Sequence, residues 1–200
     1  MRVSKEEARL FDMYKDNSLI PSEAVRLAAL GLLWQGERSY ADLAREIRHI
    51  IGRIVGPSLE LLGPSLELYK IEGLIEAVDP KLPPETQIMR LSADGQAELR
   101  RLMTTRLRGA MGEFNKLIIA FKMHFLGCLP VAEQCAQLDL LIEACDKELA
   151  RLGDLRTYTP LSQSNSHLTS WLDLEIAEVD GRRQWFQALQ ARLAAMADKL

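Results

Sequence analysis

The sequence has few of the residues that mark disulfide-bonded, loop-rich or membrane-spanning proteins. It contains only three cysteines, 12 glycines and 8 prolines among 200 residues. The three cysteines are an odd number at spacings that suit no disulfide framework, which predicts a reducing compartment, the cytoplasm. No apolar run approaches the roughly 20 residues that a membrane-spanning helix needs, and the first residues lack the apolar core of a signal peptide. These absences predict a cytoplasmic protein without a membrane partner.

The sequence also lacks an excess of positive charge and any recognisable catalytic constellation. The net charge is -3, and residues 18–91 contain eight Lys and Arg against ten Asp and Glu. Phosphate binding needs cations only where the phosphates lie, so this balance weighs against DNA binding without excluding it. No Ser-His-Asp set, glycine-rich phosphate loop or close carboxylate pair is present, which predicts a protein that is neither an enzyme nor a cofactor carrier.

Helical periodicity is the main positive signal in the first half of the chain. Apolar residues recur at helical spacing in residues 22–34 and 39–52, after a short leading helix at residues 5–14. A turn is expected at residues 35–38, and Ser39 followed by Asp42 is a capping signal for the second helix. A third helix ends at Gly73, and strands at 74–78 and 87–91 flank a proline-rich tip. The order helix, helix, helix, strand, turn, strand predicts a winged helix-turn-helix, a unit that usually places its third helix in the DNA major groove.

The start of the third helix remains open. The hexapeptide Gly-Pro-Ser-Leu-Glu-Leu occurs twice, at 56–61 and at 63–68. Pro57 suits the first turn of a helix, and Pro64 would then kink it two turns later. Alternatively the helix begins near Pro64.

The second half of the chain consists of long helices with apolar seams. Ser92 is expected to cap a long helix that stops at Gly127 and Pro130, and a second helix then runs from Val131 to Leu152. After a polar loop at 153–166, a last helix runs from about 167 to 199. Seams with this spacing need partner helices. We expect the first two helices to pack on each other and the last to keep a free face for a homodimer.

The predicted fold class is therefore mainly α with a small β-wing. An N-terminal winged helix-turn-helix with its leading helix occupies residues 1–95, and a C-terminal α-helical dimerisation and effector domain occupies residues 96–200.

Several motifs in the first half resemble the PadR family of bacterial transcriptional regulators. Leu30-Gly31-Leu32-Leu33 matches the run that ends the family's first helix, and Tyr40 with Leu43 matches its Gly-Tyr-Glu-Leu pattern, with Ser39 in the place of glycine. Pro64 matches the Leu-Tyr-Pro-Ala-Leu of the third helix, with Gly63 in the place of the aromatic residue. Arg90-Leu91-Ser92 and Gly95 match the Arg-Leu-Thr-x-x-Gly that ends the wing.

The second half is similar to the longer-tailed PadR subgroup, in which an apolar helix ends near Leu-Pro, here Leu129-Pro130, and a final helix carries Trp, here Trp185. The resemblance covers nearly the whole chain. It implies a dimeric regulator that binds palindromic double-stranded DNA, usually as a repressor, and that releases it on binding a small-molecule effector. The alternative is a winged-helix protein-interaction module without DNA affinity, favoured by the acidic head and by Glu60 and Glu67.

Candidate DNA contacts follow from chemistry and from the matched motifs. Hydroxyl and ammonium groups on the third helix reach phosphates or base edges, and a stiff wing tip presents a lysine at little entropic cost. Arg45, Arg48, His49 and Arg53 form a basic side of the second helix, which is either a phosphate-binding face or a solvated face paired with Asp42 and Glu46. The predicted DNA-binding residues are Ser39, Tyr40, Arg45, Arg53, Ser58, Pro64, Ser65, Lys70, Lys81 and Arg90.

The remaining candidates are aromatic and sulfur side chains. Trp171 and Trp185 are expected near one face of the last helix, where they either line an effector pocket or pack at the dimer interface. His124, Cys128 and Cys135 have a spacing that suggests metal ligands, but a fourth ligand is missing. Core cysteines are the preferred interpretation, so no metal is predicted.

Overall fold

The computed structural model describes residue 19 and residues 21–54, 56, 66–83, 86–107, 113–158 and 167–197. It is mainly helical with one three-stranded antiparallel sheet, which confirms the predicted fold class. The head consists of α2 (Pro21–Gln35), β1 (Arg38–Ser39), α3 (Tyr40–Ile54), α4 (Leu66–Ile71), β2 (Ile75–Ala77) and β3 (Ile88–Leu91). The following elements are α5 (Ala93–Thr104), α6 (Glu113–His124), the short 3-10 helix η3 (Leu126–Cys128), α7 (Val131–Thr157) and α9 (Leu168–Ala197).

The wing is a hairpin with an added edge strand. β2 and β3 pair antiparallel, as the sequence predicts for this hairpin, and their register places Glu76 opposite Arg90. β1 pairs with the other edge of β3, with Arg38 opposite Met89. We predicted a turn at residues 35–38, and a strand as short as β1 carries no period of its own to reveal it.

Capping residues begin or end three helices where the sequence predicts. The Ser39 hydroxyl accepts the backbone N–H of Asp42 at 3.1 Å, and the Ser92 hydroxyl accepts that of Gly95 at 3.0 Å. Gly73 has a φ of 73° and ends α4 in a Schellman motif, in which the Leu74 N–H donates to the Tyr69 carbonyl at 2.9 Å. These caps fix the register of α3, α4 and α5 around the wing.

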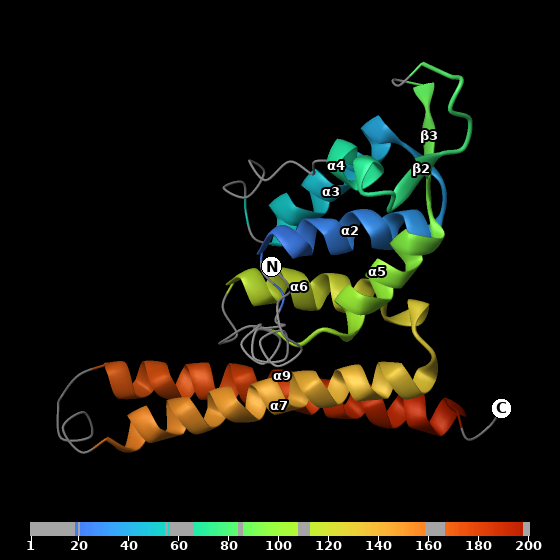
Figure 1. The fold of residues 1–200 in the computed structure, drawn as a ribbon. Coiled ribbons are helices and arrows are strands. Elements are labelled where there is room, and N and C mark those ends of the chain that lie inside the picture. Colours follow the sequence, from blue (N-terminus) through green and yellow to red (C-terminus); the bar gives the residue numbers. More distant parts are fainter. Residues whose placement is uncertain are drawn as a thin grey trace, which may run out of the picture.

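The main core forms around α2, which lies between the α3–α4 pair and the helices α5 and α6 (Figure 1). Leu27, Leu30 and Leu32 on α2 are fully buried. A Cβ at Gly31 would lie 2.3 Å from the Phe125 ring, so the glycine of the Leu-Gly-Leu-Leu motif permits this close packing. The buried residues of this core extend from Leu19 to Leu129, so the core includes residues on both sides of the predicted domain boundary at 95/96. The division into two domains at this boundary stays a prediction.

The tail is an antiparallel hairpin of α7 and α9 that lies across the end of the molecule opposite α4 and the wing (Figure 1). The Gln190 side chain donates to Asp139 at 2.6 Å, and Arg156 pairs with Asp173 at 2.7 Å near the other end. Cys145 and Phe186 lie in the core of this hairpin. The expectation that the first two long helices would pack on each other was wrong, because α7 packs mainly along α9.

The expected single helix after Ser92 was also wrong. α5 ends at Thr104, and the backbone at Thr105 is extended, with φ -72° and ψ 142°. Leu107 then forms a β-bridge with Leu19, whose N–H donates to the Arg106 carbonyl at 3.1 Å. The apolar spacing continues through Leu107 because that side chain is half-buried against the core, although it is not helical.

Several predicted features lie outside the described residues. They are the leading helix at 5–14, residues 57–65 of the doubled hexapeptide, and therefore the candidate contacts Ser58, Pro64 and Ser65. The described part of the third helix is α4.

Candidate nucleic-acid interface

The orientation of α4 is set by two side chains that it buries. Leu66 is fully buried and Tyr69 is 5% exposed, so both point into the head core. Arg26 on α2 lies over the Tyr69 ring at 5.3 Å from its centroid. The opposite side of α4 presents Glu67, Leu68 and Ile71 to the outside.

A hydrogen-bonded chain ties α4 to the wing. The Lys70 ammonium donates to Gln87 Oε1 at 3.0 Å, and Gln87 Nε2 donates to the Leu82 carbonyl at 2.9 Å. Gln87 is 6% exposed, so this chain is shielded from water. Lys70, a predicted phosphate contact, is therefore engaged inside the head. Gln87 was missed, although its alternation with Met89 and Leu91 along the strand marks it as inward-facing.

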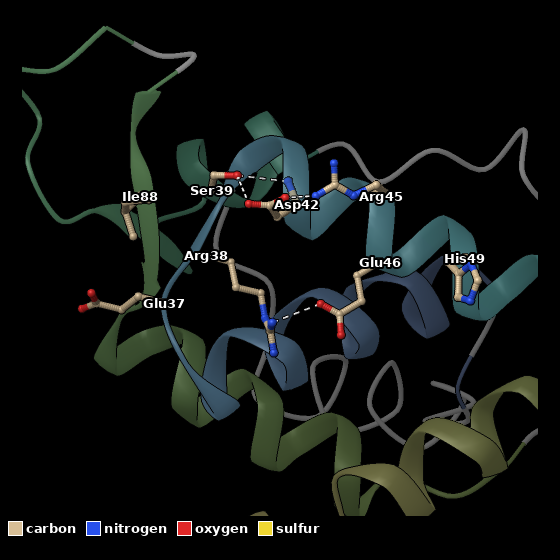
Figure 2. Close-up of a pocket in the computed structure, with 8 residues that line it drawn as sticks. All are labelled: Glu37, Arg38, Ser39, Asp42, Arg45, Glu46, His49 and Ile88. Atoms are coloured by element: carbon tan, nitrogen blue, oxygen red, sulfur yellow. Dashed lines mark hydrogen bonds and ion pairs between the residues drawn. The ribbon is translucent and has the colours of Figure 1, made fainter.

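A second group of charges surrounds an open pocket of about 670 Å³ between β1, α3 and Ile88 of β3. Figure 2 shows that Arg38 and Glu46 point toward each other across it, and their ion pair measures 3.1 Å. The Ser39 hydroxyl donates to Asp42 at 2.7 Å, and Arg45 pairs with the same carboxylate. With three acids against two arginines and His49 in the lining, this pocket offers no net positive charge to an anion.

Other cations of the head point outward without a carboxylate partner. Within the described residues, Arg48 and Arg53 on α3 and Lys81 at the wing tip are exposed, and no ion pair engages them. The backbone N–H of Lys81 donates to Asp79 at 3.0 Å, which shapes the tip. Arg90, in contrast, pairs with Glu76 at 2.8 Å across the wing strands. Tyr40 is half-buried and packs against the head core.

An ion network connects α4 to α5, the helix that leads toward the tail. Arg26 pairs with Glu72 at 2.9 Å and with Glu98 at 3.3 Å. Arg101 pairs with Glu98 at 2.7 Å and with Glu23 at 3.0 Å. The hydrogen bond from Arg101 holds the pKa of Glu98 below its ordinary value. The network therefore links α2, the end of α4 and α5 at neutral pH.

Lys122 on α6 is fully buried and joins three elements behind the head. Its ammonium donates to the carbonyls of Met103 at 2.6 Å and Thr105 at 2.7 Å, at the end of α5. The third donor reaches Gln137 Oε1 on α7 at 2.6 Å. Burial lowers the pKa of Lys122 to about 7. Sequence reasoning missed this residue, although Lys122 follows the apolar Ile118 by four residues, a spacing that places both on one face of a helix.

Trp171 and Trp185 both lie on the outer face of α9, with 51% and 49% of their surfaces exposed. Fourteen residues of helix separate them by about 21 Å. Their candidate effector role therefore needs a second surface to complete a pocket.

The candidate sulfur ligands are not assembled into a metal site. Among the described residues, no three His, Cys, Asp or Glu side chains are placed to hold a metal ion. His124 packs on Phe125, with ring centroids 4.6 Å apart, and its Nε2 lies 3.4 Å from Gln35 Nε2. Cys145 is buried, and burial raises the pKa of its thiol.

Within the described ranges, none of the helices has the length and apolar composition that crossing a bilayer requires.

Residues 14–190 match the model of the family described as "Putative AphA-like transcriptional regulator". No curated protein matches the chain.

Among solved structures, Bacillus subtilis PadR in complex with operator DNA is similar at 19% identity and a TM-score of 0.33, covering 84% of this chain and 96% of that one. The same protein in complex with p-coumaric acid has 17% identity and a TM-score of 0.36, covering 88% and 99%. A PadR-like transcriptional regulator from Bacillus cereus has 19% identity and a TM-score of 0.36, covering 86% and 99%. Superpositions this loose place no individual residue.

Proposed function

Because the chain belongs to the family of AphA-like, PadR-like transcriptional regulators, we propose that it is a dimeric repressor that binds palindromic operator DNA. The observation that supports DNA binding is the order α2, α3, α4, β2, β3, with α4 tied to the wing through Lys70 and Gln87. Such a unit inserts its third helix into the major groove while the wing contacts the backbone. Arg53 and Lys81 are the proposed phosphate contacts, together with Arg48.

The proposed homodimer forms through the outer face of α9. Leu174, Trp185 and Met196 are spaced by eleven residues, about three helical turns, so they form one line with Trp171 beside it. All four side chains are about half or more exposed. A line of large apolar side chains along a 30-residue helix is typical of an interface. A two-fold pairing of this face would give the two heads the symmetry of a palindrome.

Sedimentation velocity tests this dimer. Leu174→Lys with Trp185→Lys is expected to yield a monomer with unchanged helix content, since both side chains point away from the hairpin core. Gln187→Lys, on another exposed side of α9, is the matched control and should stay dimeric. A dimer that survives the double substitution would contradict the α9 interface.

The effector is proposed to be a small aromatic or apolar molecule that binds where Trp171 and Trp185 meet the partner subunit. It would shift the spacing of the heads only if it prefers the state that does not bind DNA. Tryptophan fluorescence during titration with p-coumaric acid, the compound held by the Bacillus subtilis protein, is a first test. Unchanged fluorescence in the wild type and in Trp185→Phe would exclude this compound.

The main test of the function is fluorescence anisotropy on the upstream promoter DNA of the protein's own gene. The comparison is a scrambled duplex, at low and at moderate salt. Tight binding to the promoter alone that survives moderate salt would establish a sequence-specific regulator. Weak binding to both duplexes that vanishes with salt would count against it, because such binding is only electrostatic.

We also propose a cytoplasmic location, which suits the free thiols of Cys128, Cys135 and Cys145.

A second candidate function is a winged-helix module that binds another protein. It is favoured by the pairing of Arg38, Arg45 and Arg90 with carboxylates, which leaves the head few free cations. Absence of binding to any duplex, in the presence or absence of effectors, would favour this candidate.

A further inference from the structure

The outward face of α4 is apolar and acidic rather than cationic. Ile71 is 81% exposed and Leu68 is 44% exposed, and Glu67 lies exposed beside them. Residues 67, 68 and 71 fall within about 100° of one another around a helix, so they form one continuous strip. We call these three side chains the α4 strip.

The α4 strip cannot turn inward without dismantling the head. Leu66 and Tyr69 occupy the core on the opposite side, and Lys70 is held by Gln87 of the wing. The Schellman motif at Gly73 fixes where the helix ends. Figure 1 shows α4 at the end of the molecule away from the α7–α9 hairpin, so the tail of the same chain does not cover the strip.

We propose that the α4 strip determines base preference, with Leu68 and Ile71 contacting thymine methyl groups and Glu67 accepting a hydrogen bond from a cytosine amino group. The inference rests on the proposed DNA-binding function and names which bases this helix prefers. In the major groove only thymine carries a methyl group, which apolar side chains contact. Cytosine N4 is the base donor that a carboxylate accepts well.

The same strip excludes the commonest ways of reading purines. Bidentate recognition of guanine needs Arg or Lys, and that of adenine needs Asn or Gln. On the described part of α4 the only such side chain is Lys70, which is engaged with Gln87. A carboxylate that loses water without gaining a donor is penalised, so Glu67 also disfavours the wrong base at its position. The half-site under α4 is therefore expected to contain thymines next to a cytosine.

The experiment starts from a pool of randomised duplexes, from which full-length wild-type protein selects its preferred site. Each thymine of that site is then replaced singly by deoxyuracil, which removes only the methyl group. Anisotropy is measured for wild type, Leu68→Ala and Ile71→Ala. Leu155→Ala is the matched control, because Leu155 is also exposed (39%) but lies on α7, away from the head.

A coupling between methyl group and side chain is the expected result. At one or two thymines, deoxyuracil should weaken wild-type binding about three- to fivefold, the size expected for one buried methyl group. The same replacement should not weaken binding by Ile71→Ala or Leu68→Ala further, whereas Leu155→Ala should be as sensitive to it as the wild type. Such non-additivity identifies the pair in contact, whereas a general loss of affinity would not.

Glu67→Gln tests the polar half of the inference. A glutamine prefers adenine, so the variant should select adenine where the wild type selects cytosine. Because all three side chains are exposed, circular dichroism melting curves of the variants should match the wild type.

The two proposals fail in different ways. In one case the wild type enriches a site, every variant keeps the wild-type sensitivity to deoxyuracil, and Glu67→Gln selects the same base as the wild type. The strip then does not read bases, and only this inference is overturned. If the wild type enriches no site, the DNA-binding function and this inference are both overturned, and the strip is left as a surface for a protein partner.

Discussion

Lys122 shows how one side chain holds the junction between the head and the tail. Its three N–H donors match three acceptors, two at the end of α5 and one on α7. No carboxylate is among these partners, so the surrounding carbonyls alone stabilise the charge. The residue therefore couples the place where α5 ends to the position of α7.

The first prediction concerns the pH dependence of stability at Lys122. The folded-state pKa is about 7, below the usual 10.5, so between these values the unfolded chain retains a proton that the folded chain has lost. The free energy of unfolding should then rise with pH in this window, by up to about 1.4 kcal/mol per pH unit. Urea unfolding of wild type and Lys122→Met at pH 7 and pH 9 measures this as a widening difference.

At pH 7 itself, Lys122→Met should cost about 1–3 kcal/mol, because the Met103 and Thr105 carbonyls and Gln137 lose their donor. Lys116→Met on the exposed side of α6 is the control and should change little. A difference that stays constant from pH 7 to pH 9 would contradict the lowered pKa.

The second prediction concerns Gly31. Its substitution by alanine brings a Cβ to 2.3 Å from the Phe125 ring, which is fully buried and stacked with Phe121. The clash should lower the free energy of unfolding by about 1–3 kcal/mol, more than the helix propensity gained. Gly153→Ala on α7 meets open space and should be neutral or stabilising in the same urea titration. Equal effects at both sites would show that the close packing is unimportant.

At the residue scale, the sequence predicts what local chemistry decides. Ser39, Gly73 and Ser92 cap their helices as expected, since a cap needs only a residue type and its neighbours in sequence. Gln87 and Lys122 were not predicted, because their partners are residues 70 and 137, which only the folded chain brings close.

At the scale of elements, apolar spacing reveals buried faces and not the continuity of a helix. Met103, Leu107, Leu117 and Phe121 are all packed in the core, as a seam requires, but the chain leaves the helix at Thr105 and Leu107 forms a β-bridge with Leu19. Periodicity likewise does not reveal which two helices pack against each other. α7 packs along α9, and the spacing of apolar residues within one helix does not identify its partner helix.

The third prediction concerns the ion network that joins α2, α4 and α5. The pKa of Glu98 is lowered by the Arg101 hydrogen bond, so its contribution to stability is present above the ordinary value of 4.5 and is lost as the pH falls. Glu98→Gln should therefore cost about 0.5–1 kcal/mol at pH 7, and the difference should disappear under acid conditions. Thermal melts of this variant and of Glu37→Gln, an exposed control in the same head, measure it. A cost that persists at low pH would point to packing instead of charge.

At the scale of the whole molecule, the sequence predicts a head, a tail and a symmetric pair. In the proposed DNA complex, the exposed charges of the two heads would determine the affinity. Each head offers Arg53 and Lys81 without an ion-pair partner among the described residues, and in the proposed dimer two-fold symmetry would double every phosphate contact. Replacing either residue with alanine should weaken promoter binding and flatten the plot of log affinity against log salt. The slope should fall by roughly two, one counterion for each head. Lys147→Ala removes the same charge from α7, so an equal change there would assign the effect to net charge and remove Arg53 and Lys81 from the DNA-binding surface.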